Sequence, residues 1–215
     1  MRGIAEGRAR LLARTSDDVS FVGTSYTLVR NHPDGTTITL LSTGDSLAAV
    51  LPGTPTVNVI AEGVSAGDYV AFSTSINDPE IDGGIFRLVD GRAVPVAMGN
   101  GASRLAINRQ GDLVFRSHRQ VLRQRVDGGD PEPIFDASML GGRIRRVSIA
   151  DDGPVAVVVQ FRGARTGGVI LWTPVGTSAL IVQSGDSNGA GDTFNEFRTS
   201  RVWFRDDGAV VFTAK

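Results

Sequence analysis

One segment of the chain has the spacing of a metal-binding loop, Asp186-Ser-Asn-Gly-Ala-Gly-Asp192. Asp186, Asn188 and Asp192 place side-chain oxygens at its first, third and seventh positions, with glycine at the sixth, as in an EF-hand-like calcium loop. The match fails at the fifth position, which is Ala190, and at the twelfth, where Phe197 replaces the usual glutamate. These three residues are the predicted metal ligands, and calcium is the one cofactor that the sequence suggests. The alternative is a glycine-rich crossover turn between strands.

Other side chains capable of chemistry lie apart from one another. His32 adjoins a Pro-Asp-Gly turn and His118 falls in a tight hairpin, and neither has a second ligand at metal-binding spacing, so we expect both to be solvated. The chain has no cysteine, which excludes a thiolate nucleophile, and no Gly-x-Ser-x-Gly motif. Its 23 acidic residues could include a glycosidase pair, but most lie where turn chemistry explains them. The sequence predicts no catalytic residue.

Arginine supplies almost all of the basic charge and is concentrated in the middle of the chain. The clustered residues are Arg104, Arg109, Arg116, Arg119, Arg123, Arg125, Arg143, Arg145 and Arg146. On alternating strands they could form a basic stripe for phosphate or acidic glycans. Few aromatic residues interleave with them, as stacking on nucleic acid requires, and aspartates lie close by in the sequence. We therefore expect a solvated face of mixed charge and no nucleic-acid partner, in agreement with a net charge of -1.

The elements that position these residues follow from one repeated motif, Asn108-Arg-Gln-Gly-Asp-Leu-Val-Phe115. A polar turn residue and a glycine suit a hairpin, and the apolar run that follows suits a strand buried on both faces. Near-copies end at Phe21, Phe72, Val157 and Phe212. These positions lie about one four-stranded propeller blade apart.

Each repeat continues with a third strand, a turn and a fourth strand. We expect third strands at residues 26–30, 85–89, 121–125 and 169–173, and fourth strands at 37–41, 93–97, 133–135 and 179–183. Pro131 and Pro133 cannot donate ladder hydrogen bonds, so their strand must lie at an outer edge. The pattern predicts an all-β fold of four-stranded, propeller-like blades. We expect one domain, residues 1–215, with units at about 8–45, 56–100, 103–136 and 145–186 and a partial unit at 200–215.

Composition agrees with this fold class. A chain of 215 residues with 41% hydrophobic and 21% charged residues is ordinary for a globular protein and indicates no membrane span. Twenty-seven glycines and nine prolines favour many short strands joined by turns. Residues 8–14 are compatible with a short helix or with a strand, and the repeat of Ile4-Ala-Glu-Gly at Ile60 favours the strand.

The Asn-x-x-Gly-x-x-Val-Phe hairpin at Asn108, the Gly-Gly-Ile-Phe strand at residues 83–86 and the Gly-Asp pairs at 44 and 185 resemble a family of bacterial tandem-repeat proteins named for an NxxGxxAF motif. The resemblance covers residues 15–215, although Ala150 and Arg205 replace the asparagine elsewhere. It implies a propeller-like protein that is secreted or anchored at the cell surface. It implies no particular chemistry.

Two functions from different classes are compatible with these observations. The first is a non-catalytic secreted or cell-surface module that binds a protein or glycan through its loop face. The second is a propeller hydrolase or lyase that acts on polysaccharide with carboxylates at the central channel. The absence of a catalytic constellation in the sequence favours the binding module.

We also expect the chain to be part of a larger propeller. Residues 200–213 suit the opening pair of a unit, while residues 8–22 suit the opening pair of the first unit, so neither end would complete the other. Such an arc leaves strand edges unpaired and should associate edge to edge. The alternative is a ring of four blades in which residues 200–213 pair with the strand at 25–30.

Overall fold

β-strands make up 57% of the part of the chain that the computed structural model describes. That part comprises residues 3–5, 9–11, 18–22, 27–32, 34–99, 101–161, 166–197 and 200–214. Two compact units divide the chain, Met1–Gly111 and Asp112–Lys215. No helix among the described residues has the length and apolar character needed to cross a membrane.

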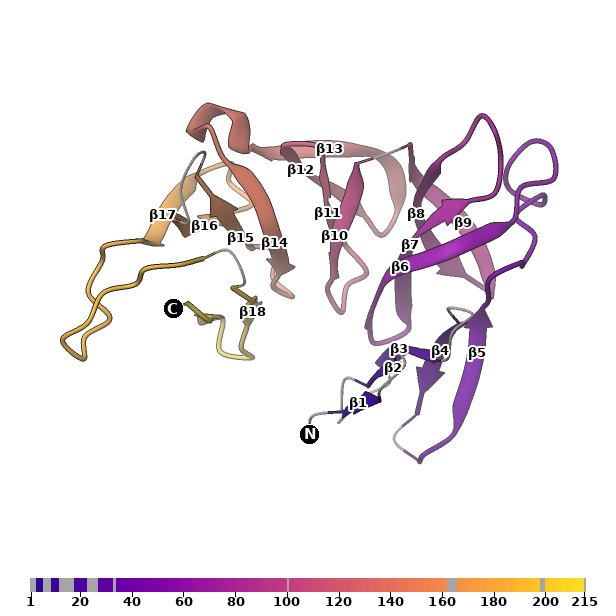
Figure 1. Cartoon of the computed structure of the whole chain (residues 1–215), viewed down its shortest axis with the longest axis horizontal. Helices are drawn as coiled ribbons and strands as arrows, with labels where there is room; N and C mark the ends of the chain where they lie inside the picture. Colours follow the sequence, from indigo (N-terminus) through magenta and orange to yellow (C-terminus); the bar gives the residue numbers. More distant parts are fainter. Residues whose placement is uncertain are drawn as a thin grey trace. The chain divides into compact units, whose positions relative to one another are not determined.

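The first unit contains short antiparallel sheets whose neighbouring strands follow one another in the sequence (Figure 1). Its strands are β1 (Gly3–Ala5), β2 (Ala9–Leu11), β3 (Asp18–Val22), β4 (Thr27–Asn31), β5 (Thr37–Leu41), β6 (Val57–Ala66), β7 (Tyr69–Ile76), β8 (Gly83–Val89), β9 (Arg92–Met98) and β10 (Ala102–Ile107). β1 pairs with β2, β3-β4-β5 form a three-stranded sheet, and β6-β7-β8-β9 form a four-stranded sheet.

The second unit continues the same arrangement. Its elements are β11 (Leu113–Ser117), β12 (Gln120–Arg125), β13 (Gly128–Asp136), the 3₁₀ helix η1 (Ala137–Leu140), β14 (Arg143–Ile149), β15 (Val155–Gln160), β16 (Gly167–Trp172), β17 (Ser178–Gln183), β18 (Val202–Phe204) and β19 (Val210–Phe212). Within this unit β11-β12-β13 are neighbours in one sheet, β14-β15-β16-β17 form a four-stranded sheet, and β18 pairs with β19. The fold is all-β and consists of propeller-type repeats of four-stranded antiparallel sheets, as the repeated motif predicts.

Most predicted strands are confirmed, including the outer-edge position of the strand that carries Pro131 and Pro133. That strand, β13, pairs with β12 alone in its sheet, and it is longer than the predicted residues 133–135. At the start of the chain, residues 9–11 are a strand and not a helix, as favoured.

One expectation about the first repeat is wrong, and one alternative is not found. Residues 8–22 do not form an opening pair, because β2 pairs with β1 and lies outside the β3-β4-β5 sheet. β1 and β2 are three residues apart, so closing their hairpin costs little chain entropy. The ring that would pair residues 200–213 with the strand at 25–30 is also not found, since β4 has β3 on one edge and β5 on the other. That a longer propeller contains this chain stays a prediction, as does the single-domain assignment.

The second strands β7, β11 and β15 are among the most deeply buried elements of the described chain. Residues 155–159 of β15 are all inaccessible to solvent, as are Leu113, Val114 and Phe115 of β11. In contrast, β17 is exposed at every position except Val182. A run of apolar residues therefore marks a strand with neighbours on both sides, while the fourth strand meets solvent.

The glycine that precedes β7, β11, β15 and β19 adopts the left-handed conformation, as predicted from the repeated turn. The φ angles are 56° at Gly67, 86° at Gly111, 103° at Gly153 and 78° at Gly208. A residue with a Cβ is strained in this region. The N–H of Gly111 donates to the carbonyl of Asn108 over 3.0 Å, and Gly208 makes the same bond to Arg205 over 2.9 Å. The turn thus requires glycine for its backbone geometry.

Replacing Gly208 by alanine is expected to destabilise the protein by about 1 kcal/mol. No atom lies within 4 Å of the position that a Cβ would occupy, so backbone strain is the cause. The measurement is urea unfolding, with Gly208→Asn as the control because asparagine tolerates this conformation better than alanine. Gly111→Ala should behave in the same way, and an alanine variant as stable as the parent would contradict the assignment.

A recurring β-bulge orients arginines of the third strands. The ladder between the third and fourth strands shifts by one residue after Leu28, Ile85, Val121 and Val169. The second residue beyond each shift is Arg30, Arg87, Arg123 and Leu171, in that order. Bulges of this kind re-aim side chains. Three of the four repeats therefore place an arginine at the same point of the sheet.

These arginines contact the glycine turn of the following repeat. In the first unit, Arg30 Nη2 donates to the carbonyl of Gly67 over 2.6 Å, and Arg87 Nη1 donates to the carbonyl of Gly111. In the second unit, the Arg123 guanidinium lies within 4 Å of the Cβ position of Gly153. It also pairs with Asp112 and lies 6.0 Å from the centre of the Trp172 ring. The contacts join consecutive repeats within each unit.

The expectation of a solvated arginine face is wrong for Arg123. Its residue exposure is 9%, the same as that of Asp112. Asp112 accepts a hydrogen bond from Arg123 through Oδ2 and a second from the Val126 N–H through Oδ1 over 3.1 Å. A buried charge needs a partner of opposite charge. The spacing of the residues in the sequence did not predict this pair, because strand register brings Asp112 and Arg123 together. Arg109, Arg119, Arg125 and Arg143 are exposed as expected.

Asp112→Ala is expected to destabilise the protein by about 3 kcal/mol, because it removes the carboxylate from a buried guanidinium. The double variant Asp112→Leu with Arg123→Met, which substitutes apolar side chains for both partners, should recover most of that loss. Urea unfolding of both single variants and the double variant tests the coupling. A double variant no more stable than Asp112→Ala would argue against the ion pair as the cause.

Candidate functional site

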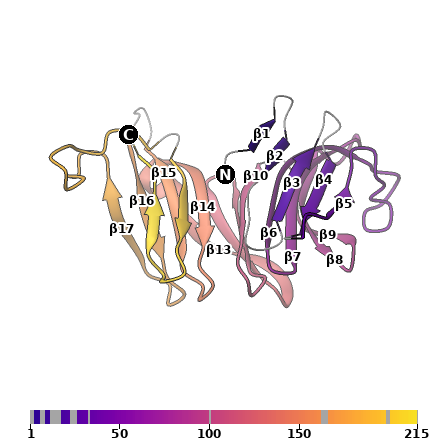
Figure 2. The same ribbon diagram turned by 90° about the horizontal axis from the view of Figure 1, so that it is seen from below.

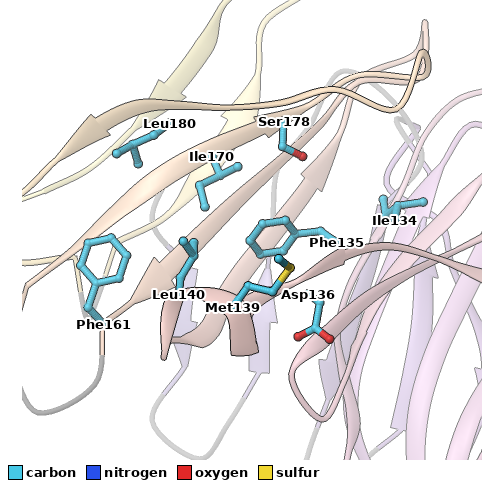
Figure 3. Close-up of a pocket in the computed structure, with 9 residues that line it drawn as sticks. All are labelled: Ile134, Phe135, Asp136, Met139, Leu140, Phe161, Ile170, Ser178 and Leu180. Atoms are coloured by element: carbon cyan, nitrogen blue, oxygen red, sulfur yellow. The ribbon is translucent and has the colours of Figure 1, made fainter.

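An apolar pocket lies in the second unit, between the strand β13, the helix η1 and the strands β16 and β17 (Figure 3). Its volume is about 430 Å³. The residues that line it are Ile134, Phe135, Asp136, Met139, Leu140, Phe161, Ile170, Ser178 and Leu180. Seven of these nine side chains are apolar. A concave apolar surface with a few polar groups is the usual form of a binding site.

One wall of the pocket depends on the bulge in β13. Val121 is opposite Phe135 and Leu122 is opposite Pro133, so Ile134 is the extra residue of the ladder. Neighbouring side chains of a regular strand point to opposite faces, whereas a bulge disturbs this alternation. Ile134 and Phe135 consequently line the same pocket. Proline at 133 is compatible with this position because β13 is an edge strand.

The opposite wall is a regular face of β16 and β17. Ile170 is directly opposite Leu180 in the ladder, and Ser178 lies two residues from Leu180 on the same face. Figure 3 shows these three side chains across the pocket from Met139 and Leu140 of η1. Ile170 is buried at 4% exposure, while Leu180 is half exposed at 48%. The wall therefore runs from the core to the surface.

The position of η1 follows from its caps. Asp136 Oδ1 accepts a hydrogen bond from the Ser138 N–H over 2.7 Å, and Gly141 ends the helix with a left-handed φ of 60°. Ala137 is fully buried and anchors the turn. Hydrogen bonds from the Ser138 side chain and N–H hold the pKa of the Asp136 carboxyl below its usual value of 3.8. Asp136 is therefore ionised at neutral pH and serves as a cap.

The crossover that contains η1 differs from the longer crossovers in how it uses its apolar side chains. The crossover after β5 buries Leu47 and Leu51 at 2% and 9% exposure, and the crossover after β17 buries Phe197 completely. In η1, Met139 is 88% exposed and Leu140 is 46% exposed. Large apolar side chains at a concave surface mark an interaction site. The crossovers after β5 and β17 thus cover the hydrophobic core, whereas the crossover that contains η1 leaves the pocket open.

The polar side chains that line the pocket are Asp136 and Ser178. Asp136 is the one carboxylate among the residues that line it, and hydrolysis of a glycoside by the usual route needs two. Among the described residues, no group of three or more His, Asp and Glu side chains could hold a metal ion. Sequence reasoning did not identify this pocket. Its one signal is the pair Met139-Leu140, two large apolar residues in a segment predicted to be a crossover.

The predicted calcium ligands lie in the crossover after β17. Ser187 and Thr193 form an isolated antiparallel β-bridge, and the N–H of Asn188 donates to the carbonyl of Asp192 over 2.9 Å. The loop is therefore a small hairpin. Asn188 Oδ1 accepts hydrogen bonds from the N–H groups of Ala190 and Asp192 over 2.9 and 3.2 Å. The loop brings the three predicted residues onto one turn. Some of their side-chain oxygens already accept hydrogen bonds from backbone N–H groups.

The carboxylate of Asp186 makes the same turn hydrogen bond as that of Asp45 in an earlier repeat. Asp186 Oδ2 accepts from the Gln183 N–H over 2.8 Å, and Asp45 Oδ2 accepts from the Ser42 N–H over 2.7 Å. Both aspartates follow a left-handed glycine, at φ 97° and 93°. The Gly-Asp pair is therefore a repeated turn that begins a crossover. Calcium binding by Asp186, Asn188 and Asp192 stays a prediction.

Calcium at this loop would raise the thermal midpoint, because a ligand that binds the native state stabilises it by mass action. The measurement is the Tm of the parent and of Asp192→Ala in millimolar calcium and in EDTA. The parent should respond to calcium, whereas the variant should not. Equal Tm values of the parent in both solutions would contradict the site.

The two histidines and the remaining arginines lie outside the pocket. His118 occupies the two-residue turn between β11 and β12 with a φ of 54° and is exposed, as expected. Arg145 and Arg146 are half-buried at the bulge of β14, and the half-buried Arg116 of β11 donates from Nη1 to the carbonyl of Ile144 beside that bulge over 3.5 Å. Arg146 Nη1 donates to the carbonyl of Arg145 over 3.0 Å, and Arg145 Nε donates to Gln160 Oε1 over 2.7 Å. These hydrogen bonds stabilise the β14-β15 ladder where its register shifts.

Comparison with solved structures supports the fold. A prolyl endopeptidase shares 12% identity over 95% of this chain and 32% of its own, with a TM-score of 0.62. Regucalcin from Agrobacterium tumefaciens strain C58, a calcium-binding protein, shares 16% identity over 81% of this chain and 59% of its own, with a TM-score of 0.51. This chain thus spans about a third of the first chain and over half of the second. Likeness at these identities shows the propeller-type fold.

No protein-family model matches the chain. A search of curated proteins also finds no match.

Proposed function

We propose that the chain is a non-catalytic binding module whose apolar pocket at β13, η1, β16 and β17 receives an apolar side chain of a protein partner. The observation that carries the proposal is the open pocket with Met139 and Leu140 exposed at its edge. Burial of one large apolar side chain stabilises a complex by about 1.5–3 kcal/mol. A pocket of about 430 Å³ has room for such a group.

The lining favours a protein partner over a glycan. Sugars are recognised through many hydroxyl groups, whereas the polar side chains of the pocket are Asp136 and Ser178. Met139 is flexible and polarisable, as is common at surfaces that accept varied apolar groups. The alternative of a polysaccharide hydrolase or lyase draws no support from the pocket, because its lining has a single carboxylate.

Met139→Gln and Leu180→Gln are each expected to weaken binding of an apolar probe about tenfold, which corresponds to about 1.4 kcal/mol. The probe is 8-anilinonaphthalene-1-sulfonate, whose fluorescence gives the Kd. The matched control is Val175→Gln in the turn between β16 and β17, because Val175 is 84% exposed and does not line the pocket. Equal losses in the control and the pocket variants would contradict the site.

A second measurement tests the class of partner. Peptides selected on the parent should contain a large apolar residue, compete with the probe and bind Met139→Gln more weakly. Val175→Gln should bind them normally. Glycans that bind the parent with an affinity unchanged in Met139→Gln would assign recognition to another surface.

We further propose that this binding takes place outside the cell or at its surface. Support comes from the NxxGxxAF-like motif at Asn108 and from the family that the motif resembles. Labelling of the protein on intact cells with a membrane-impermeant reagent tests the location. Labelling only after lysis would oppose it.

A further inference from the structure

The strand β17 forms an exposed outer edge of a complete four-stranded sheet. All four strands of the sheet β14-β15-β16-β17 lie in the second unit, and Figure 2 shows β17 at one end of the row. Among the described strands, β17 pairs with β16 alone. Leu180 and Ile181 are 48% and 43% exposed, so solvent reaches this strand. An exposed edge of this kind is a template for a further strand.

The hairpin of β16 and β17 determines which backbone groups point to the outer edge. The N–H of Thr173 donates to the carbonyl of Thr177 over 2.9 Å, so Thr177 faces β16. Backbone groups alternate between the two edges of an antiparallel strand, and Ala179 therefore also faces β16. Ser178 and Leu180 direct their N–H and C=O groups to the outer edge. No described residue outside the strands accepts a hydrogen bond from either of these N–H groups.

The two residues with outward backbone groups also line the apolar pocket. Ser178 and Leu180 are the residues of β17 in its lining. Alternate residues of a strand share both an edge and a face of the sheet. A residue of an added strand directly opposite Leu180 would project its side chain from the same face, because opposite residues of two paired strands lie side by side. The outer edge and the pocket therefore form one continuous surface.

β17 differs from β13, the other fourth strand of the second unit, in lacking residues that oppose pairing. β13 contains Pro131 and Pro133, which cannot donate ladder hydrogen bonds, and acidic residues beside them. β17 has the sequence Ser-Ala-Leu-Ile-Val-Gln, with neither proline nor charge. Prolines and charges are common means of blocking an exposed edge. Of these two outer strands, β17 is thus the one suited to accept a partner strand.

The crossover after β17 limits the length of the edge that a partner can use. The N–H of Ser184 donates to the carbonyl of Gly167 over 2.9 Å, so Ser184 faces β16 and Gln183 faces outward. The outward N–H of Gln183 already donates to Asp186 Oδ2 over 2.8 Å. Asp186 therefore closes this end of the edge. The part open to pairing is residues 178–182, which suits a short extended segment.

Given the binding function proposed for the pocket, we infer that its apolar occupant belongs to an extended segment of the partner that pairs antiparallel with the outer edge of β17. The partner residue opposite Leu180 exchanges two backbone hydrogen bonds with it and places its side chain in the pocket. Antiparallel pairing is slightly more stable per residue than parallel pairing, and the ladders of the second unit are antiparallel. In such complexes main-chain hydrogen bonds provide affinity, and the pocket provides specificity.

N-methylated peptides test the pairing without any change to the protein. The probe is an acetylated and amidated pentapeptide with leucine at its centre and threonine at the other positions. Its Kd is measured by displacement of 8-anilinonaphthalene-1-sulfonate. N-methylation of the central leucine should weaken binding by at least about tenfold, because it removes the N–H that bonds to the Leu180 carbonyl. N-methylation of either adjacent threonine should change the Kd by less than about twofold, since those N–H groups face away from β17.

Amide hydrogen exchange of the parent, followed by NMR, provides an independent readout. Saturating unmethylated peptide should slow exchange at Leu180 by at least about tenfold, because its outward N–H becomes hydrogen-bonded. Exchange at Ala179, whose N–H faces β16, is the control and should change far less. Unchanged exchange at Leu180, or a peptide that fails to displace the dye at millimolar concentration, would overturn the extended pairing.

The methylation series separates this pairing from the proposed binding function. Equal affinities of all the methylated peptides, with binding still weakened by Met139→Gln, would overturn the pairing and leave the pocket as the binding site. Equal losses at every methylated position would also overturn it, because a helical or irregular partner does not alternate its hydrogen bonds. If Met139→Gln has no effect on either the dye or the peptide, both the pairing and the proposed function fail.

Discussion

Packing between consecutive repeats depends on the glycine turn that joins the first and second strands. Its left-handed backbone turns the chain sharply and leaves a carbonyl oxygen accessible to the preceding repeat. In the first unit, Arg30 and Arg87 donate to that carbonyl at Gly67 and Gly111. A hydrogen bond from a charged donor contributes more than a neutral one, and the contact places one sheet against the next. Where Leu171 replaces the arginine, the fourth repeat lacks this donor.

The same bulge that aims the arginines also shapes the surface. Its extra residues on the fourth strands are Leu40, Val96, Ile134 and Ile181, all of them apolar. Their surroundings differ, because Leu40 packs against the hydrophobic core of the first unit whereas Ile181 is 43% exposed. The long crossover after β5 is folded over its neighbours with Leu47 and Leu51. The four residues of η1 are too few to do the same, so Ile134 lines an open pocket.

The function of a protein with this fold depends more on the crossovers between sheets than on the sheets themselves. The solved structures that share the fold include a prolyl endopeptidase and a calcium-binding protein, so the fold does not by itself assign an activity. Sheets packed through buried second strands leave little freedom for a site in their interiors. Variation is tolerated in the segments that connect them. In this chain the distinctive surface is therefore formed by a crossover and by the outer strands beside it.

The amino-acid sequence was sufficient to predict the strands and the turns, because both depend on local chemistry. Gly111 marks a left-handed turn, Leu113 to Phe115 mark a strand buried on both faces, and Pro133 marks an edge. The tertiary structure decided which side chains meet. Asp112 and Arg123 form a buried pair through strand register, and Ile134 reaches the pocket through a one-residue shift of the ladder. The pairing of β2 with β1 was likewise decided by competition between neighbouring strands, which have similar local patterns and differ in the chain length that must be closed.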